Sequence, residues 1–144
     1  MYLKRLKNCE AGDVWTIVGV CTDRGECPAD DFLCGLDANY NKDINRVRAL
    51  FTHVAQQGPT LLPVEVSHNI APEIFEFIRG KLRIAWFYGE GGKMVICSHG
   101  FVKKGQKTPR AEIDAAKRAK ERYLAAFRRG EVTILEEESL GHGV

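Results

Sequence analysis

The stretch IFEFIRGKLRIAWFY, residues 74–88, decides the fold. Its apolar residues alternate with a period of two before and after Gly80, and a turn at this glycine would pair the two halves as antiparallel strands. The residues that share a face in each half are Phe75 and Phe77, then Leu82, Ile84, Trp86 and Tyr88. A glycine-rich turn at residues 89–92 leads into residues 94–101. The sequence therefore predicts an antiparallel meander of three strands.

Helical patterns precede and follow this meander. Pro28 stands where a first helical position would be, and acidic residues follow it in the order that the helix dipole favours. Apolar residues recur at helical spacing over residues 44–54, and Gly58 ends that segment. A third, long helix is predicted from Pro109 to near Gly130.

The remaining segments give weaker patterns. Residues 15–21, WTIVGVC, are rich in β-branched and aromatic residues and predict a strand. Residues 61–72 are interrupted by Pro63 and Pro72, so we expect a loop with at most a small edge strand. The predicted order is strand, helix, helix, strand, strand, strand, helix, which is an α+β fold.

The chain has 144 residues, 44% of them hydrophobic and 28% charged, which is typical of a globular protein. We expect one domain over residues 1–130 and an acidic tail over residues 131–144. No apolar run approaches the ~20 residues that span a bilayer, and the start has no apolar stretch typical of a secretory signal. The five cysteines form no CxxC pair. We therefore expect reduced thiols, a cytoplasmic location and no membrane partner.

The charge is unevenly distributed along the chain. Residues 1–78 hold 7 Lys and Arg against 11 Asp and Glu, a net −4, and residues 130–144 hold none against 4, also −4. Residues 79–129 hold 14 against 4, a net +10, so the total is +2. A field of that sign favours a polyanion such as nucleic acid.

Two segments carry a family resemblance. FEFIRGKLRIAWFY (residues 75–88) places an Arg-apolar-aromatic strand after an acid-apolar-Arg segment, and HGFVKKGQKTPRAEIDAAKRAKERY (residues 99–123) places paired lysines before a basic helix. Over residues 60–125 the chain resembles RelE/HigB-type toxins of bacterial type II toxin–antitoxin systems, especially their phage-derived branch. The resemblance implies a RelE-like fold, a small twisted antiparallel sheet packed against helices.

The resemblance also implies an mRNA interferase, usually acting on mRNA in the ribosome, and a cognate antitoxin, here expected to be a helix-turn-helix protein. RNA carries its own nucleophile, the 2′-hydroxyl, so the enzyme has to align it, remove its proton and stabilise the phosphate charge. This chemistry requires no metal or other cofactor. The sequence shows no carboxylate cluster that would hold one.

The resemblance assigns candidate catalytic residues. Arg83 matches the phosphate-stabilising arginine, Arg79 the arginine ending the preceding strand, and Lys103 and Lys104 the paired lysines. Adjacent side chains of an extended segment point to opposite faces, so we expect only one lysine to meet the scissile phosphate and the other to grip RNA backbone. The alternative for Arg79 and Arg83 is a solvated charge at the hairpin tip. We expect Arg83→Ala to abolish toxicity and leave the fold intact, because an exposed arginine contributes little stability.

His99 is a candidate proton shuttle, as the one histidine in the basic part of the chain. The favoured alternative is a buried, hydrogen-bonded core histidine, because His99 has the strand parity of Cys97. The sequence assigns no role to His53, His68 or His142.

Candidate RNA-binding residues surround the catalytic set. Lys81, in the turn, would lower the activation barrier of RNA cleavage by its charge alone, or would be a solvated side chain. Tyr123 would stack on a base or belong to the core. Phosphate contacts are predicted for Lys107 and Arg110. The helical run Lys117, Arg118, Lys120 and Arg122 is either a solvated face or a contact with ribosomal RNA.

The acidic tail suggests a hypothesis of its own: it folds back to screen the RNA site, or it marks where an acidic antitoxin segment binds. The alternative is a tail that frays.

Two other functions stay open. Toxins similar to ParE share the fold and poison DNA gyrase without cleaving anything. The third possibility is a nucleic-acid-binding regulator derived from an inactive toxin. The paired lysines and the hairpin arginines favour RNA cleavage.

Overall fold

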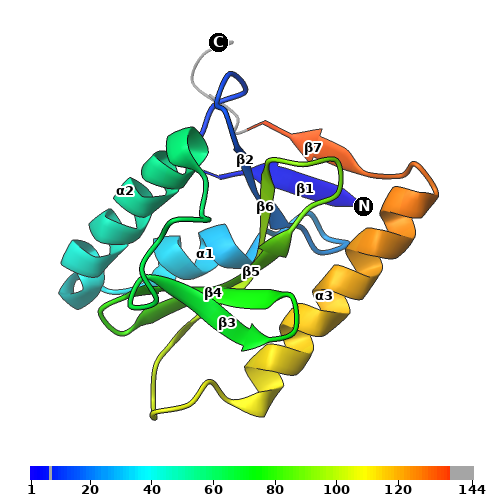
Figure 1. The fold of residues 1–144 in the computed structure, drawn as a ribbon. Coiled ribbons are helices and arrows are strands. Elements are labelled where there is room, and N and C mark those ends of the chain that lie inside the picture. The colour runs from blue at the N-terminus through cyan, green and yellow to red at the C-terminus, as the bar shows by residue number, and fades with distance from the viewer. Residues whose placement is uncertain (7, 137–144) are drawn as a thin grey trace.

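The computed structural model describes residues 1–6 and 8–136. In this part of the chain, three α-helices and one short 3-10 helix accompany a seven-stranded sheet (Figure 1). In chain order the elements are β1 (Tyr2–Arg5), β2 (Thr16–Val20), α1 (Pro28–Gly35), the 3-10 helix η1 (Ala38–Tyr40), α2 (Asn41–Gln57), β3 (Ser67–Ala71), β4 (Ile74–Arg79), β5 (Leu82–Tyr88), β6 (Met94–Val102), α3 (Arg110–Arg128) and β7 (Thr133–Leu135). The predicted α+β class is confirmed.

The sheet is mixed, with the strand order β3-β4-β5-β6-β2-β1-β7. Strands β3 to β6 are consecutive and antiparallel, which confirms the meander and adds β3 at its outer edge. In contrast, β2 runs parallel to β6, and β7 runs parallel to β1, so the sheet is not antiparallel throughout. Strands β1 and β7 were not predicted, because runs of 4 and 3 residues are too short to give a periodic pattern.

Helices α1 and α2 cover one face of the sheet, and α3 covers the other (Figure 1). The alternation read from the sequence divides the strands accordingly: Phe77 and Trp86 pack toward α2, whereas Ala85 and Phe87 pack toward α3 with Tyr123. Each large side chain buried in this way contributes on the order of 2 kcal/mol. The sheet is therefore held between two apolar layers, and β3 is the outermost strand on the side of the meander.

A β-bulge in β6 moves side chains from one face to the other. Ala85 and Trp86 of β5 pair with His99 and Cys97 of β6, so Ser98 is the extra residue. A shift of one residue reverses the alternation, and Cys97 therefore packs in the α1/α2 core while His99 bonds to α3. The expected shared parity of His99 and Cys97 is wrong for this reason.

The turn between β4 and β5 is closed by Gly80. Its φ of +56° lies in the left-handed region that favours glycine. A Cβ added here would collide with the Asp43 carboxylate of α2. The turn is thus pressed against α2, which fixes the end of the hairpin where the arginines lie.

The described part of the C-terminal segment lies at the far end of the sheet from β3. Strand β7 pairs with β1, and the Glu136 carboxylate accepts from Arg5 Nε at 2.7 Å. This hydrogen bond is the main cause of a lowered Glu136 pKa. Up to Glu136 the segment does not screen the β3–β4 edge. The rest of the predicted tail, with His142, lies outside the described residues.

Candidate functional site

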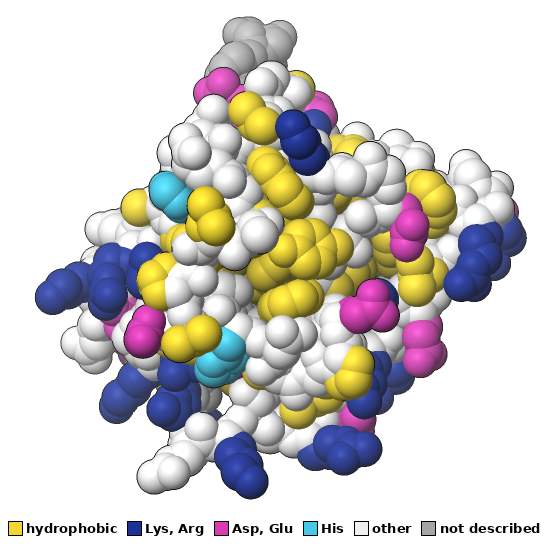
Figure 2. Space-filling view, viewed as in Figure 1, with side chains coloured by type: hydrophobic (Ala, Val, Ile, Leu, Met, Phe, Trp, Pro, Cys, Tyr) yellow, Lys and Arg dark blue, Asp and Glu magenta, His cyan; other side chains and the backbone are white. Residues whose placement is uncertain are grey.

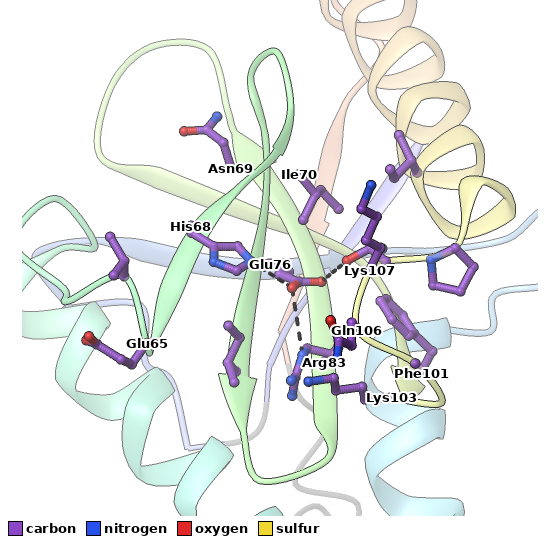
Figure 3. A pocket seen from close by; sticks show the side chains of 16 residues that line it. Glu65, His68, Asn69, Ile70, Glu76, Arg83, Phe101, Lys103, Gln106 and Lys107 are labelled. Carbon is purple, nitrogen blue, oxygen red and sulfur yellow. Dashed lines mark hydrogen bonds and ion pairs between the residues drawn. The ribbon is translucent and has the colours of Figure 1, made fainter.

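A cavity of about 510 Å³ opens at the β3–β4 edge of the sheet, on the face covered by α3. Its walls are β3, β4, the preceding residues Val64 and Glu65, and the segment 103–109 that joins β6 to α3, together with Arg83 of β5, Phe101 of β6 and Ile113 of α3. Figure 3 shows side chains from these separate elements converging on it. We call this cavity the edge cavity.

Glu76 lies at the centre of the edge cavity. One carboxylate oxygen is 2.8 Å from His68 Nε2 and 3.7 Å from Arg83 Nε, and the other accepts a 2.8 Å hydrogen bond from Thr108 Oγ1. The Glu76 side chain is only 4% exposed, whereas that of His68 is 42% exposed. A buried carboxylate thus joins three elements: β3, β5 and the segment before α3 (Figure 3).

The strand register brings these residues together. His68 of β3 is directly opposite Glu76 of β4, so their side chains stand on the same face. Arg83 of β5 is opposite Ile78, two residues along β4 from Glu76, which makes Arg83 and Glu76 diagonal neighbours. Three adjacent strands therefore place a histidine, a carboxylate and an arginine in one row.

Arg83 is buried, with 8% exposure, and not a solvated charge at the hairpin tip. Its Nη1 donates to the carbonyl oxygens of Gly80 at 2.8 Å and Leu82 at 3.0 Å, and its Nε faces Glu76. Among the described residues nothing accepts a hydrogen bond from Nη2, so this nitrogen remains able to donate to a ligand. The premise that Arg83 is exposed is wrong, and we now expect Arg83→Ala to lower stability, because removing this buried charge leaves Glu76 without its cation.

The two paired lysines differ in position. Lys103 lines the edge cavity and Lys104 does not. Lys107 lines it as well, from the same segment. The cavity thus has three cationic side chains, Lys103, Lys107 and Arg83, against two carboxylates, Glu76 and Glu65. This small excess of positive charge suits an anionic ligand.

His99 lies outside the lining of the edge cavity. Its Nδ1 is 2.8 Å from Ser98 Oγ, and its Nε2 is 3.0 Å from Glu112 Oε1 in the first turn of α3. The ring is largely covered, with 17% of the side chain exposed. These contacts give His99 a structural task, since they attach the start of α3 to β6.

Arg79 and Lys81 also lie outside the edge cavity. Arg79 lines a second hollow on the α2 face of the hairpin, because it alternates with Ile78 along β4. Lys81 is exposed in the turn. The structure therefore separates Arg79 from Arg83, which the sequence had placed in one site.

The predicted RNA contacts on α3 lie on its surface, with one exception. Arg110 is 82% exposed and pairs with Asp114, and Arg118 is exposed too, while Lys117 is partly buried. Tyr123 is 1% exposed, and its hydroxyl accepts the Glu90 backbone N–H at 2.8 Å. Burial raises the pKa of this phenol. Tyr123 belongs to the core, the alternative that its helical spacing favoured, and its candidate role in stacking on a base is wrong.

The sequence missed Glu76 and His68. Glu76 stands on the opposite face from Phe75 and Phe77, so a carboxylate within an apolar strand was a readable signal. His68 gave none, because β3 has the polar sequence SHNIA and was expected to be mostly loop.

The molecular face that bears β3 and β4 carries both basic and hydrophobic side chains. Figure 2 shows Lys and Arg side chains along its lower part and at both sides, with hydrophobic side chains at its centre. Within residues 1–6 and 8–136, no three His, Cys, Asp or Glu side chains are arranged to hold a metal ion. The described helices include none with the length and apolar character needed to cross a bilayer.

The match to a protein-family model covers this whole site. The family described as phage-derived protein Gp49-like (DUF891) matches residues 31–121, more than half of the chain, from α1 into α3. No curated protein matches the chain. Because the matched range includes every residue that lines the edge cavity, the family relation and the site concern the same part of the molecule. The chain belongs to the Gp49-like family of phage-derived proteins, within the RelE/ParE-like toxin superfamily.

Proposed function

We propose that this protein is the toxin of a toxin–antitoxin system and that it acts as an mRNA interferase, a metal-independent endoribonuclease working on ribosome-bound mRNA in the cytoplasm. One observation carries the proposal: Glu76 holds both Arg83 and His68 in a cavity bordered by Lys103 and Lys107. An arginine, a histidine and lysines around one hollow supply what RNA self-cleavage needs, namely charge neutralisation and proton transfer.

His68 is the proposed general base. A carboxylate can only accept hydrogen bonds, so the contact with Glu76 requires a proton on His68 Nε2. In the neutral ring Nδ1 is then the acceptor, and it can take the proton of a 2′-hydroxyl. Glu76 is a positioning residue in this scheme, because it orients the ring and does not touch the RNA.

Arg83 and Lys103 are the proposed phosphate ligands. Arg83 offers Nη2, since its other nitrogens are already engaged by Glu76 and by backbone carbonyls. These contacts hold the guanidinium in place before the substrate arrives, which is the arrangement that stabilises a developing negative charge most effectively. The ammonium groups of Lys103 and Lys107 supply further charge and a proton for the leaving 5′-oxygen.

Expression in a bacterial host tests the proposal. We expect wild-type protein to arrest growth and to produce primer-extension ends within translated codons, and we expect His68→Gln to lose both effects. Growth arrest with intact mRNA and an induced DNA-damage response would instead indicate a gyrase poison. Harmless expression of the folded protein would indicate an inactive regulator. The cognate antitoxin, proposed to be a helix-turn-helix protein encoded in a neighbouring frame, should restore growth when co-expressed.

A further inference from the structure

The second hollow, on the α2 face of the β4–β5 hairpin, has no role in the proposed cleavage. Its volume is about 510 Å³, and it lies between α2, the segment before β3 and the end of β4. Two arginines and a histidine line it, together with aliphatic side chains: Arg46, His53, Arg79, Leu50, Leu62 and Val66. We call it the α2 groove.

Arg79 is the unusual residue of the α2 groove. The described residues provide no hydrogen-bond acceptor and no carboxylate for its guanidinium, and its electrostatic neighbour is another cation, Arg46. Arg46 itself is paired with Asp43 at 3.2 Å. The pKa of Arg79 is lowered, mainly by partial burial of its guanidinium and secondly by the nearby charge of Arg46. A partly desolvated cation facing a like charge is unfavourable until an anion arrives.

The apolar part of the groove indicates what kind of anion fits. Leu50 is buried, while Leu62, Pro63 and Val66 leave part of their surface open to the hollow. Leu61, next to this wall, is 95% exposed. The part of the lining that the structure describes is mainly aliphatic and contains no Phe, Tyr or Trp, so His53 is its single aromatic ring on which a base could stack. These features favour a protein ligand over RNA.

We propose that the α2 groove binds an amphipathic segment of a partner protein, in which carboxylate side chains pair with Arg79 and Arg46 while aliphatic side chains pack on Leu62 and Val66. A carboxylate can accept two parallel hydrogen bonds from one guanidinium, and a helix with apolar and acidic residues on one side presents both chemistries together. The choice of source rests on the proposed function: the cognate antitoxin of a toxin in this superfamily would supply such a segment.

The α2 groove adjoins the edge cavity. Leu62, Pro63 and Val66 face the groove, whereas Val64 and Glu65 line the cavity. The same short segment is therefore a wall of both hollows. A partner bound in the groove would lie beside the RNA site without touching its catalytic residues, so peptide binding is separable from cleavage in experiments.

Fluorescence anisotropy with labelled probes tests the inference. The first probe repeats Leu-Glu-Glu-Leu, the second replaces leucine by serine, the third replaces glutamate by lysine, and the fourth is a single-stranded RNA oligonucleotide. The proteins are the wild type, Arg79→Glu, Arg79→Gln and Arg24→Glu. Arg24→Glu is the matched control, because Arg24 is exposed, lines neither hollow and undergoes the same charge change. Circular dichroism establishes which variants are folded.

We expect the Leu-Glu-Glu-Leu probe to bind wild type and Arg24→Glu alike, and to bind Arg79→Glu at least about tenfold more weakly. Arg79→Gln keeps the side-chain size and should also weaken binding, which preserves the test if the glutamate variant does not fold. The serine and lysine probes should bind wild type weakly. Equal affinity of the leucine-glutamate probe for wild type and Arg79→Gln would overturn the inference, as would loss of RNA binding in Arg79→Gln without loss of peptide binding.

Discussion

The two faces of the β4–β5 hairpin each carry an arginine, and the two arginines differ in burial and in their hydrogen-bond and ion-pair partners. On the α3 side, Arg83 is buried and engaged by Glu76 and by two backbone carbonyls. On the α2 side, Arg79 is partly buried beside Arg46 and has no acceptor among the described residues. The two side chains start only four residues apart.

This difference means that the edge cavity is preorganised, whereas the α2 groove lacks an anion for its arginine. In the edge cavity the protein itself supplies the partners that hold the guanidinium, so little has to reorganise when charge develops on a bound phosphate. In the α2 groove the compensating charge has to come from another molecule. Similar side chains in one hairpin can thus serve catalysis on one face and partner binding on the other.

The largest expected effect is on stability, from Glu76→Ala. Removing this carboxylate leaves Arg83 buried without its anion and removes the acceptor of Thr108 and His68, so we expect a loss of about 3 kcal/mol in the free energy of unfolding. Urea titration measures it. Glu65→Ala, an exposed carboxylate lining the same cavity, is the control and should change stability by less than about 0.5 kcal/mol. Equal stability of the two variants would mean that Glu76 does not organise the edge cavity.

His68→Gln sharpens the contrast between the two hollows. Loss of the proposed base should lower the cleavage rate by roughly 100-fold, and stability should change little because the His68 side chain is 42% exposed. His53→Gln makes the same change in the α2 groove, where we expect cleavage to stay near the wild-type rate. Rates measured on ribosome-bound mRNA decide this. If His53→Gln lowered the cleavage rate more than His68→Gln, the chemistry would take place in the α2 groove and not in the edge cavity.

Lys103→Gln and Lys104→Gln compare two adjacent lysines. Because Lys103 lines the edge cavity and Lys104 does not, we expect Lys103→Gln to lower the cleavage rate about tenfold and Lys104→Gln to have a smaller effect. The same assay at rising salt should lessen the difference, since screening weakens each charge contact. A larger loss of cleavage rate from Lys104→Gln than from Lys103→Gln would mean that the phosphate binds on the Lys104 side of the segment 103–109.

The smallest expected effect is from Arg79→Gln. Removing a partly desolvated cation that faces Arg46 relieves a repulsion, so we expect the free energy of unfolding to stay within about 0.5 kcal/mol of wild type or to rise slightly. Arg83→Gln should instead lose about 2 kcal/mol, because buried acceptors lose their donor. Thermal and urea unfolding provide both values. If Arg79→Gln is as destabilising as Arg83→Gln, Arg79 has a structural partner and the two sides do not differ.

Much of the fold could be predicted because its main elements carry strong periodic patterns. The alternation over residues 74–88 predicted β4, β5 and which of their side chains share a face, and the structure adds that the two faces belong to two cores. The helical spacing over residues 44–54 likewise predicted α2. The pairing of β2 with β6 and of β1 with β7 could not be read, because parallel contacts between distant segments leave no local pattern.

The site could be predicted only in part. Arg83 and Lys103, proposed from the resemblance, and Lys107, predicted as a phosphate contact, all line the edge cavity. Arg79 was assigned to the same site, although it is next to Ile78 and therefore on the other face. The face on which His99 lies was predicted wrongly, because a β-bulge in β6 reverses the alternation and no residue pattern in β6 indicates that bulge. His68 depends on the edge position of β3, a tertiary feature that a polar strand does not reveal.

The most direct test of the account is the chemistry of the RNA ends. Purified protein would be incubated with ribosomes bearing a defined mRNA, and the fragments would be analysed by mass spectrometry. We predict 5′-hydroxyl ends paired with 2′,3′-cyclic phosphate or 3′-phosphate ends, produced by wild type and strongly reduced in His68→Gln. Fragments with 5′-phosphate and 3′-hydroxyl ends, or mRNA that stays intact with folded wild-type protein, would contradict cleavage by 2′-hydroxyl attack in the edge cavity.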